Sequence, residues 1–570
     1  MNPTTTEPAG APAPQSDRTP LTLEALAERF AAAARELWPD AQPVVQFEPA
    51  RRAEFGEISS NVALPLAKVA RAKPQDLAAA LIERALADDA VRATVARAEP
   101  TAGFVNLTLV PAFWQRVVAD VLRRGEDYGR AARAGERISL EFGSANPTGP
   151  LAVVQGRALS AGDTLAKILR HAGYDVFTEW IINDAGNQIA LFGLSVYARY
   201  RQLFDPSYPF PEDGYAGDYV VDIAKKLRER DGEKWLDVPA DEAAPQIGRF
   251  ARDVVVAEQQ DVARRFGVTY DLWQSEKALH DAGAIERGVQ RLRDLGVLYE
   301  RDGATWLRTR DAGDDEDRVV IRSDGRPTYY ANDVAYHYDK LQRADHVIDI
   351  LGPDHHGYIA RLNALAQAYG RPKAIEVLIA QQITLKRGGE TVSMSKRAGT
   401  LITLQDVIDE VGVDAARFFF VMLSLEQPLT FDLDLAKKQS NENPVYYVQY
   451  GHARIASVLR RAAEQAPEAL AAAPAGATLT RLVEPAEIAL VRRLAEFPAA
   501  VAGAARARAP HRVPKYARDL ASDFHQFYDT CRVLTDDREL TAARLSLCIA
   551  TKTVLASALH LCGVGAPDSM

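Results

Sequence analysis

The segment of residues 141–188 constrains the fold most, because with the residues just before it this segment predicts a strand, a turn, a helix and a second strand. Residues 138–142 form a short apolar run, and a cluster of turn residues follows at 146–150. Apolar residues at helical spacing then occur over 159–169, and residues 175–182 predict the second strand. A βαβ unit with a tight first turn presents backbone N–H groups and a helix N-terminus to a phosphate, so the pattern favours nucleotide chemistry.

The composition is that of a globular multidomain chain. Its 570 residues are 47% hydrophobic and 25% charged, so several domains with sizeable cores are expected. No apolar run is long enough to span a bilayer, which predicts a cytoplasmic protein with no membrane partner. Residues 1–20 are rich in Pro, Ala and Thr and lack the regions of a signal peptide, so a disordered tail is predicted. Cys531, Cys548 and Cys562 match no zinc or disulfide template and are expected to be buried free thiols.

The order of the patterns predicts a multidomain fold in three parts. An α+β N-terminal domain is expected over residues 21–130. A Rossmann-type α/β domain over 131–440 follows, with a helical insertion at about 190–265, because strand and helix patterns alternate there. Helical patterns predominate over 441–570 and predict an all-α bundle, interrupted by a linker loop at 466–479.

Four motif blocks carry a resemblance to a known family. They read Ser-Ala-Asn-Pro-Thr-Gly-Pro-Leu, Ile-Ile-Asn-Asp-Ala-Gly-Asn-Gln, Thr-Val-Ser-Met-Ser-Lys-Arg-Ala-Gly-Thr and Asn-Glu-Asn-Pro-Val-Tyr-Tyr-Val-Gln-Tyr, at residues 144–151, 181–188, 391–400 and 441–450. In this order they resemble the class I arginyl-tRNA synthetases of the bacterial type, and the resemblance extends from about residue 22 to the end of the chain.

The resemblance implies a fold and a reaction. The N-terminal domain would be of the kind placed against the tRNA elbow, the Rossmann domain would be catalytic, and the C-terminal bundle would bind the anticodon stem-loop. The implied reaction is the ATP-dependent attachment of L-arginine to tRNA(Arg) through an arginyl-adenylate. ATP with Mg²⁺ is the implied cofactor, and no structural metal is implied. The implied partners are tRNA(Arg), L-arginine and ATP, and the expected state is a monomer.

One signature of the family is altered in this chain. Where the family carries His-x-Gly-His at the start of a helix, residues 152–155 are Ala-Val-Val-Gln. Ala152 cannot donate a hydrogen bond, Val154 adds bulk where adenine would approach the backbone, and Gln155 is a donor without a cationic form. Losing one positioned donor costs about 3–4 kcal/mol of transition-state stabilisation, or about 10²–10³ in rate.

A lysine loop is expected at 391–400. Residues 393–397, Ser-Met-Ser-Lys-Arg, resemble the family's Lys-Met-Ser-Lys motif, with Ser393 in place of the first lysine. Lys396 matches the second lysine and is expected to hold the charge of the departing pyrophosphate. The catalytic residues implied are Lys396, Gln155 and Ser395. The ATP-binding residues implied are Ala152, Val154, Gln155, Gly352, Asp354, His355, His356, Met394 and Lys396.

An arginine pocket is implied by further motif positions. A guanidinium is recognised by planar carboxylates and an aromatic wall. By the resemblance, Glu141 and Asn146 hold the α-amino end of arginine, while Tyr329 and Asp333, one helical turn apart, meet its guanidinium. The remaining residues implied in this pocket are Ser144, Asp184 and Gln188. As isolated residues these acids would be ordinary surface groups, so the motif context carries the prediction.

The C-terminal bundle is expected to bind tRNA, although a net charge of −9 argues weakly against a nucleic-acid partner. Exposed aromatic side chains can stack on unpaired anticodon bases, and basic residues gather within 506–518. Taken alone, these aromatics indicate helix packing and these charges a solvated face. The tRNA-binding residues implied are Tyr446, Tyr450, Arg454, Arg508, Arg512, Lys515 and Tyr516.

Two hypotheses remain open for the altered signature. In the first, the enzyme is active and is compensated by Lys386, Arg387, Lys396 or the tRNA itself. In the second, the chain is a paralogue that binds tRNA or arginine without efficient adenylation. The retained arginine site favours the first, because a pure tRNA binder has no need of Glu141 or Asp333.

Two other functions are disfavoured. Asp354, His355 and His356 suggest a metal site, but three adjacent residues at a strand end cannot all ligate one ion, so a loop beside the adenosine is preferred. A nicotinamide-dependent Rossmann enzyme would need a Gly-x-Gly-x-x-Gly run after the strand at 138–142, and the sequence has none there.

Overall fold

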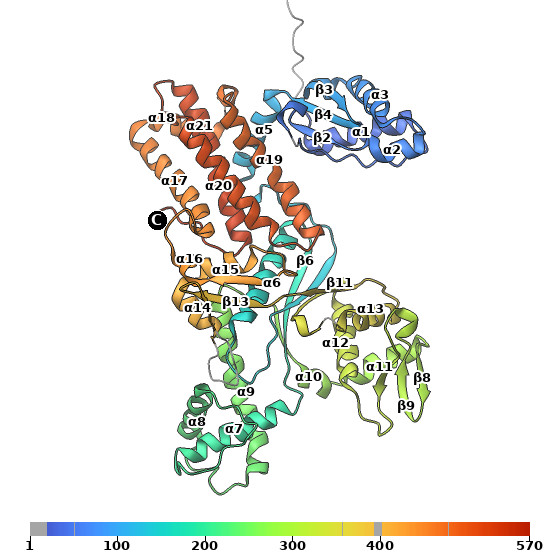
Figure 1. Cartoon of the computed structure of the whole chain (residues 1–570), viewed down its shortest axis with the longest axis vertical. Coiled ribbons are helices and arrows are strands. Elements are labelled where there is room, and N and C mark those ends of the chain that lie inside the picture. The colour runs from blue at the N-terminus through green and yellow to red at the C-terminus, as the bar shows by residue number, and fades with distance from the viewer. Residues whose placement is uncertain (1–19, 51, 356, 393–401, 477) are drawn as a thin grey trace, which may run out of the picture. The chain divides into compact units, whose positions relative to one another are not determined.

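The computed structural model describes residues 20–50, 52–355, 357–392, 402–476 and 478–570 (Figure 1). The predicted tail, apart from residue 20, and the core of the predicted lysine loop lie outside these ranges. The chain divides into two compact units. One comprises residues 1–125, 458–495 and 526–551, and the other comprises residues 126–457, 496–525 and 552–570.

The first unit contains a four-stranded antiparallel sheet with helices. Its strand order is β1-β2-β4-β3, and β4 (Phe104–Leu109) forms at the alternating apolar run near residue 105. Helix α1 (Leu23–Leu37) begins at Thr22, whose side chain accepts a hydrogen bond from the Ala25 amide at 3.2 Å. The other elements of this part are β1 (Glu48–Pro49), η1 (Ala53–Phe55), β2 (Ile58–Ser60), α2 (Ala63–Ala70), α3 (Pro74–Leu86), α4 (Asp89–Arg92), β3 (Val95–Thr101) and α5 (Pro111–Arg124).

A five-stranded parallel sheet forms the centre of the second unit. Its order is β12-β11-β5-β6-β7, with every neighbouring pair parallel. The strands are β5 (Arg137–Phe142), β6 (Asp175–Ile182), β7 (Leu272–Ser275), β11 (His346–Leu351) and β12 (Ile375–Ile379). The chain proceeds from β5 outward in one direction and later continues through β11 in the other. The carboxyl ends of β5 and β11 therefore form the switch point at which such sheets bind ligands.

Helix α6 (Val153–His171) connects β5 to β6 as the sequence predicts. It packs closely on the sheet because Gly162 faces the ring of Phe142, where an added Cβ would lie 2.1 Å from the ring carbon Cγ. Just after the helix, Gly173 takes a φ of 93°, a left-handed conformation that favours glycine.

Two further groups of elements interrupt the sheet along the chain. Helices α7 (Gln188–Gln202), α8 (Asp218–Asp231) and α9 (Ala240–Arg265) lie between β6 and β7 and share an apolar core that includes Phe192, Tyr200 and Trp235. A mixed group separates β7 from β11, and its apolar core continues into residues of β6, β11, β12 and α13 (Tyr358–Ala368). It consists of η3 (Arg310–Ala312), α10 (Glu276–Asp281), α11 (Ala284–Asp294), β8 (Leu298–Arg301), β9 (Ala304–Leu307), β10 (Arg318–Ile321) and α12 (Tyr329–Arg343).

Smaller elements follow β11. They are η4 (Pro353–His355), α13 (Tyr358–Ala368), β13 (Ile383–Arg387), β14 (Glu390–Thr391), α14 (Leu404–Val411), α15 (Val413–Val421), β15 (Leu429–Asp432) and α16 (Leu433–Lys437). Strand β13 pairs with β14 antiparallel and with β15 parallel, which forms a second small sheet.

The C-terminal part is helical, as predicted. Its elements are α17 (Pro444–Gln465), α18 (Pro467–Ala472), η5 (Ala473–Ala475), η6 (Leu479–Arg481), α19 (Pro485–Arg506), α20 (Arg512–Thr530) and α21 (Arg538–Leu561). The prediction of a linker loop over 466–479 is wrong where α18 forms. Pro467 is favourable in the first turn of a helix, and alanine-rich sequence continues a helix well.

Helix α21 is long and apolar enough to cross a membrane by composition alone. Because 72% of its apolar window is buried inside the protein, the same composition fits the core helix of a bundle. Cys548 lies on this helix, Cys562 directly follows it, and Cys531 directly follows α20. All three are buried free thiols, which confirms the prediction.

Candidate functional site

The altered signature lies at the beginning of α6. Ala152 is the N-cap residue with extended backbone, and its side chain makes no cap hydrogen bond. The Val153 amide donates to the Ile402 carbonyl at 3.2 Å. The Leu404 amide donates to the Leu151 carbonyl at 2.8 Å, so a short backbone ladder joins the two segments. The expectation that the first N–H groups of this helix face a phosphate is therefore wrong for Val153.

The signature side chains offer few polar contacts. Val154 is 37% exposed and Ala152 only 7% exposed. The Oε1 atom of Gln155 is buried and has no hydrogen-bond partner among the described residues. One turn later, the fully buried Arg157 donates to the carbonyls of Gln381 and Ser424 at 2.9 and 2.7 Å and so fixes the helix. Burial lowers the pKa of Arg157 to about 10.

Three carboxylates lie side by side across the centre of the sheet. Glu141 of β5 is in register with Glu179 of β6 and with Asp349 of β11. Residues in register point to the same face of a sheet, and all three are buried, at 5%, 0% and 2% exposure. Buried charges of one sign are strongly unfavourable unless cations compensate them, so this row requires partners.

Helix α12 supplies two of those partners. The Lys340 ammonium, fully buried, lies 2.6 Å from Glu141 Oε2 and 2.6 Å from Asp349 Oδ1. The His337 Nε2 atom lies 2.8 Å from Asp349 Oδ2. Burial alone would raise the pKa of Asp349, but Lys340 and His337 together hold that pKa below its usual range. Burial likewise would lower the pKa of His337, and the Asp349 carboxylate raises it instead.

The third carboxylate has its own cation on the same helix. Arg343 Nη2 lies 3.0 Å from Glu179 Oε2 and 2.9 Å from Asp339 Oδ2. The Ser139 hydroxyl also donates to Glu179. His337, Lys340 and Arg343 recur every three residues, so they share one face of α12.

Asp333 is the carboxylate without a cation. It lies one turn before His337 on α12, and among the described residues no ion pair is found for it. Burial and the nearby carboxylates of Asp349, Glu276 and Glu141 raise the pKa of Asp333 to about 6, although His337 opposes this shift. A half-buried carboxylate beside other carboxylates favours the binding of a cation.

The predicted neighbours of this pocket differ in their placement. Ser144 Oγ donates to Glu141 Oε1 at 2.9 Å, so this serine holds the acid in place. Asn146 is exposed, and its Oδ1 atom lies 3.4 Å from Asn183 Nδ2. Tyr329, the first residue of α12, is 79% exposed and forms no aromatic wall here. Roles for Asn146 and Tyr329 in arginine binding stay predictions.

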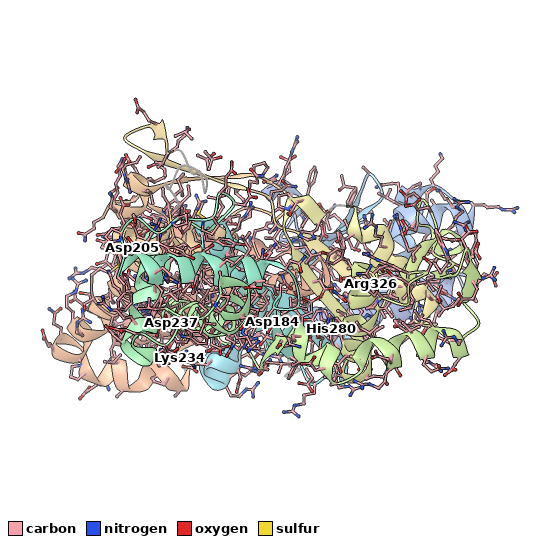
Figure 2. All side chains as sticks on the ribbon, turned by 90° about the horizontal axis from the view of Figure 1, so that it is seen from below. Asp184, Asp205, Lys234, Asp237, His280 and Arg326 are labelled. Atoms are coloured by element: carbon pink, nitrogen blue, oxygen red, sulfur yellow. The ribbon has the colours of Figure 1, made fainter. Side chains whose placement is uncertain are left out.

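Asp184 is a correction to the predicted pocket (Figure 2). It is 6% exposed, and its carboxylate accepts from Arg252 Nη1 at 3.0 Å, Ser275 Oγ at 2.8 Å and the Lys277 amide at 2.9 Å. These partners occupy it, so Asp184 ties α9 to the end of β7 and is not a free ligand for arginine. Gln188 is exposed at the first position of α7, and its role stays a prediction.

The carboxyl end of β11 carries part of the predicted ATP site. Gly352, Asp354 and His355 follow β11 directly, beside the end of β5. The Asp354 side chain is exposed, and His355 Nε2 lies 3.5 Å from Asp354 Oδ2. The predicted residues His356, Met394, Ser395 and Lys396 lie outside the described part of the chain.

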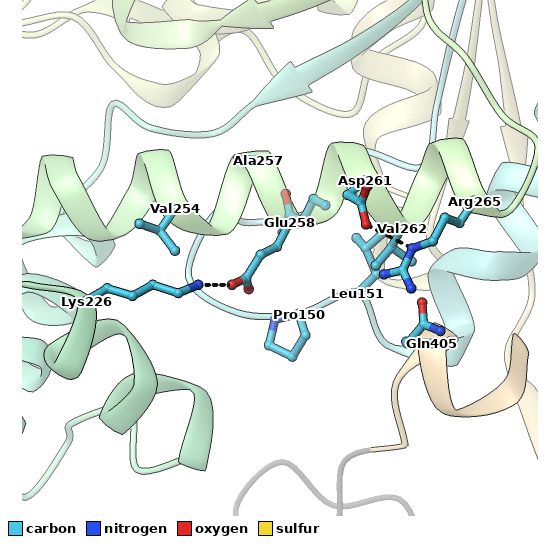
Figure 3. Close-up of a pocket in the computed structure, with 11 residues that line it drawn as sticks. Pro150, Leu151, Lys226, Val254, Ala257, Glu258, Asp261, Val262, Arg265 and Gln405 are labelled. Atoms are coloured by element: carbon cyan, nitrogen blue, oxygen red, sulfur yellow. Dashed lines mark hydrogen bonds and ion pairs between the residues drawn. The ribbon is translucent and has the colours of Figure 1, made fainter. Parts of the chain in front are cut away.

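A cavity of about 590 Å³ flanks the residues before α6 (Figure 3). Pro150 and Leu151 line it together with one face of α9 and with Gln405. Its charged groups are already paired, Lys226 with Glu258 at 2.9 Å and Arg265 with Asp261 at 2.9 Å. None of the residues predicted to bind arginine lines this cavity, and its paired charges do not match a phosphate.

Five of the residues predicted to bind tRNA are at least partly exposed, and their role in binding stays a prediction. The rings of Tyr446 and Tyr450 are stacked with centroids 6.0 Å apart, and the Arg454 guanidinium lies 5.6 Å from the Tyr450 ring. All three side chains are partly exposed. Arg512 and Lys515 are exposed on α20. These five residues are therefore placed where a ligand can reach them.

Two predicted tRNA contacts require correction. Tyr516 is 5% exposed and packs on Phe497, with ring centroids 5.4 Å apart, so it is a core residue. Arg508 is mostly buried, and its Nε atom lies 3.1 Å from Glu376 Oε2 of β12. It ties the helical part to the edge of the parallel sheet instead of facing solvent.

Comparison with known proteins decides the family. Models of the arginyl tRNA synthetase N terminal domain, of the class I (R) tRNA synthetase catalytic domain and of the DALR anticodon binding domain match residues 24–109, 117–420 and 448–570. The chain belongs to the class I arginyl-tRNA synthetases.

Relatives of this arginyl-tRNA synthetase match along most of its length. The arginine–tRNA ligase of Syntrophotalea carbinolica is 43% identical over 531 residues, which covers 93% of this chain and 95% of the relative. That of Heliobacterium modesticaldum is 45% identical over 537 residues and covers 93% and 94%. The solved structure of the Thermus thermophilus arginyl-tRNA synthetase covers 96% of this chain and 100% of its own, with a TM-score of 0.78 and 23% identity, which shows the fold.

Sequence reasoning missed His337, Lys340 and Asp349, which lie beside the predicted acids. Two sequence patterns could have identified them. Asp333, His337 and Lys340 are spaced by four and three residues, which places them on one helix face. Asp349 interrupts the apolar strand at 346–351, and a charge inside a buried strand indicates a buried ion pair.

Proposed function

We propose that this arginyl-tRNA synthetase attaches L-arginine to tRNA(Arg) at the carboxyl ends of β5 and β11. In the first step the arginine carboxylate attacks the α-phosphate of ATP, which forms arginyl-adenylate and releases pyrophosphate. In the second step a terminal ribose hydroxyl of the tRNA attacks the adenylate carbonyl and AMP leaves. Neither step needs a protein nucleophile, so the protein contributes positioning and charge stabilisation.

The observation that supports this function best is the unpaired carboxylate of Asp333. In the proposal it pairs with the guanidinium of arginine, which compensates the charge that burial and neighbouring acids make unfavourable. Glu141, held by Ser144, accepts a second hydrogen bond from the substrate. Asn146 and Tyr329 line the open side of the pocket and approach arginine when it binds.

ATP binds between the start of α6 and the loop after β11. Gly352, Asp354 and His355 approach the adenosine. Among the described residues no cluster of three His, Cys, Asp or Glu side chains is placed to hold a metal ion. Mg²⁺ enters the site bound to the phosphates of ATP. Lys396 carries most of the phosphate charge because residues 152–155 lack the imidazole pair.

For tRNA, we propose that the exposed aromatic and basic side chains of α17 and α20 contact the anticodon stem-loop. Tyr446, Tyr450 and Arg454 offer a stacking platform with a cation beside it. The N-terminal α+β domain approaches the tRNA elbow, as the family resemblance implies. Cytoplasmic location and a monomeric state belong to the same proposal.

The altered signature keeps a second candidate open, a paralogue that binds tRNA or arginine without efficient adenylation. Charging of tRNA(Arg) with radiolabelled arginine decides between the two. We expect charging, and ATP–pyrophosphate exchange near background without tRNA and clearly above it with tRNA. Binding of arginine or of tRNA(Arg) without any charging would support the second candidate, and absence of binding to both would refute both candidates.

A further inference from the structure

The row of Glu179, Glu141 and Asp349 is a buried concentration of negative charge directly under the proposed arginine site. Burying three carboxylates is tolerated only when cations with good geometry compensate them. Helix α12 provides this compensation from one face, through Lys340 between two of the acids and through Arg343 at the third.

The hydrogen bonds of His337 define its charge. Its Nδ1 atom lies 2.9 Å from the carbonyl oxygen of Asp333, and its Nε2 atom lies 2.8 Å from Asp349 Oδ2. A backbone carbonyl and an ionised carboxylate both accept, so these contacts favour a ring that donates from both nitrogens, and the Asp349 carboxylate raises the pKa of His337 accordingly. Lys340, His337 and Arg343 thus face the three carboxylates of the row from one side, and Arg343 also pairs with Asp339.

The same contacts orient Glu141. Its Oε1 atom accepts from Ser144 Oγ at 2.9 Å, and its Oε2 atom accepts from Lys340 Nζ at 2.6 Å. Both oxygens are held, yet each carboxylate oxygen has a second lone pair free for another donor. Glu141 is thus a pre-oriented acceptor whose charge the protein has already compensated, whereas Asp333 has no cation of its own.

We propose that Lys340 and His337 are positioning residues for arginine recognition, an inference that rests on the proposed function. They balance and orient the Glu141–Asp349 pair, so that Asp333 is the one carboxylate left to pair with the guanidinium. Neither residue touches the substrate. Removing Lys340 would free Glu141 to turn and leave a second uncompensated charge beside Asp333.

The test compares two basic residues of the same helix face. In Lys340→Met we expect the KM for arginine to rise about ten- to a hundredfold, the scale of losing a charged hydrogen bond, while the KM values for ATP and tRNA stay within about twofold. Lys340→Arg should recover most of the affinity. Arg343→Met is the matched control, because Arg343 lies one turn further and pairs with Glu179; its KM for arginine should change by less than about threefold.

A double-mutant cycle tests whether Lys340 acts through Glu141. Lys340→Met should add less than about twofold to the arginine KM of Glu141→Gln, since the oriented acceptor is already lost. Circular dichroism and thermal melting check folding. If Lys340→Met does not fold, the charge-balanced pair Lys340→Met with Asp349→Asn takes its place, and if that also fails, His337→Gln does.

The outcomes separate the inference from the proposed function. Unchanged arginine KM in a folded Lys340 variant, equal effects of Lys340→Met and Arg343→Met, or full additivity with Glu141→Gln would overturn the inference. If the wild-type protein binds no arginine and charges no tRNA(Arg), the proposed function fails first.

Discussion

The predicted arginine pocket and residues 152–155 both lie near the carboxyl end of β5. Their polar groups nevertheless have very different hydrogen-bond partners. On the arginine side, Glu141 and Asp349 are bonded through Lys340, and one acid, Asp333, is left without a cation. In the signature segment, Ala152 and Val154 are apolar and the Oε1 atom of Gln155 is buried without a partner in the described structure. Charged side chains therefore gather at the predicted arginine pocket, and residues 152–155 at the start of α6 carry none.

This contrast indicates which of the two regions tolerates amino-acid substitution. A balanced buried network resists substitution, because removing one member leaves a charge unpaired. The start of α6 is stabilised by backbone hydrogen bonds to Ile402 and Leu404, which do not depend on side chains. The start of α6 therefore forms without polar side chains at residues 152 and 154.

The largest effect is expected at Asp333. Asp333→Asn removes the proposed partner of the guanidinium, at a cost of about 2–5 kcal/mol, or about 30-fold to several-thousandfold in arginine affinity. Isothermal calorimetry with arginine measures it, and Asp339→Asn on the same helix is the control. Unchanged arginine affinity would contradict the contrast between the predicted arginine pocket and residues 152–155, because neither region would then bind its substrate through charge.

Restoring the signature is expected to have the next largest effect. Ala152→His, Val154→Gly and Gln155→His together should raise the rate of arginine activation about tenfold or more, a scale set by one positioned donor. Because Ala152 is only 7% exposed beside the ladder, Ala152→His alone should lower the melting temperature. ATP–pyrophosphate exchange with tRNA measures the gain; unchanged kcat and ATP KM would show that this segment does not contact ATP.

The pH dependence of arginine binding follows from Asp333. Its pKa is raised to about 6 in the protein without substrate, so the carboxylate is charged above that pH and protonated below it. A guanidinium binds the charged form, so affinity should fall about tenfold between pH 7 and pH 5, with release of about half a proton on binding at pH 6 and close to one proton at pH 5. Calorimetry in buffers of different ionisation enthalpy counts the proton; a flat profile from pH 5 to 7 would contradict this.

The raised pKa of Asp333 also predicts a pH dependence of folding stability. Stability should fall as pH rises, whereas arginine affinity should rise. A folded pKa above the ordinary value means that the folded protein holds the proton more tightly, so Asp333 destabilises the fold as pH rises from about 4 through about 6. Arginine should offset this above pH 6. Thermal melting of wild type and Asp333→Asn across this range, with and without arginine, measures the difference.

The smallest effect is expected at Gln155. Gln155→Leu removes a buried oxygen that lacks a partner among the described residues, so the melting temperature should stay the same or rise. If its amide contacts ATP as predicted, the KM for ATP should rise about threefold to tenfold. Gln405→Leu, also with an unpartnered buried oxygen, is the matched control. No change in ATP KM would leave the signature without any polar role.

Sequence reasoning succeeded where a local pattern is sufficient. The βαβ unit appears as predicted, with β6 at Asp175–Ile182 and α6 ending before Gly173. The predicted loop at 466–479 failed because alanine and proline can start a helix as well as form a loop. Tyr516 failed because its neighbours in the sequence are basic, while only packing against Phe497 shows that it is buried.

The sequence by itself determined the family and the order of the domains, and it predicted a set of acids for arginine binding, because these depend on motifs and on short-range periodicity. The tertiary structure decided which of these acids is free of an ion pair and can pair with a ligand. Asp184 and Asp333 are equivalent in a sequence, but Arg252 comes from 68 residues away to occupy Asp184, and no cation reaches Asp333 in the described structure. Charge compensation is set by distances of a few ångströms between elements far apart in the chain, and such distances are absent from any local pattern.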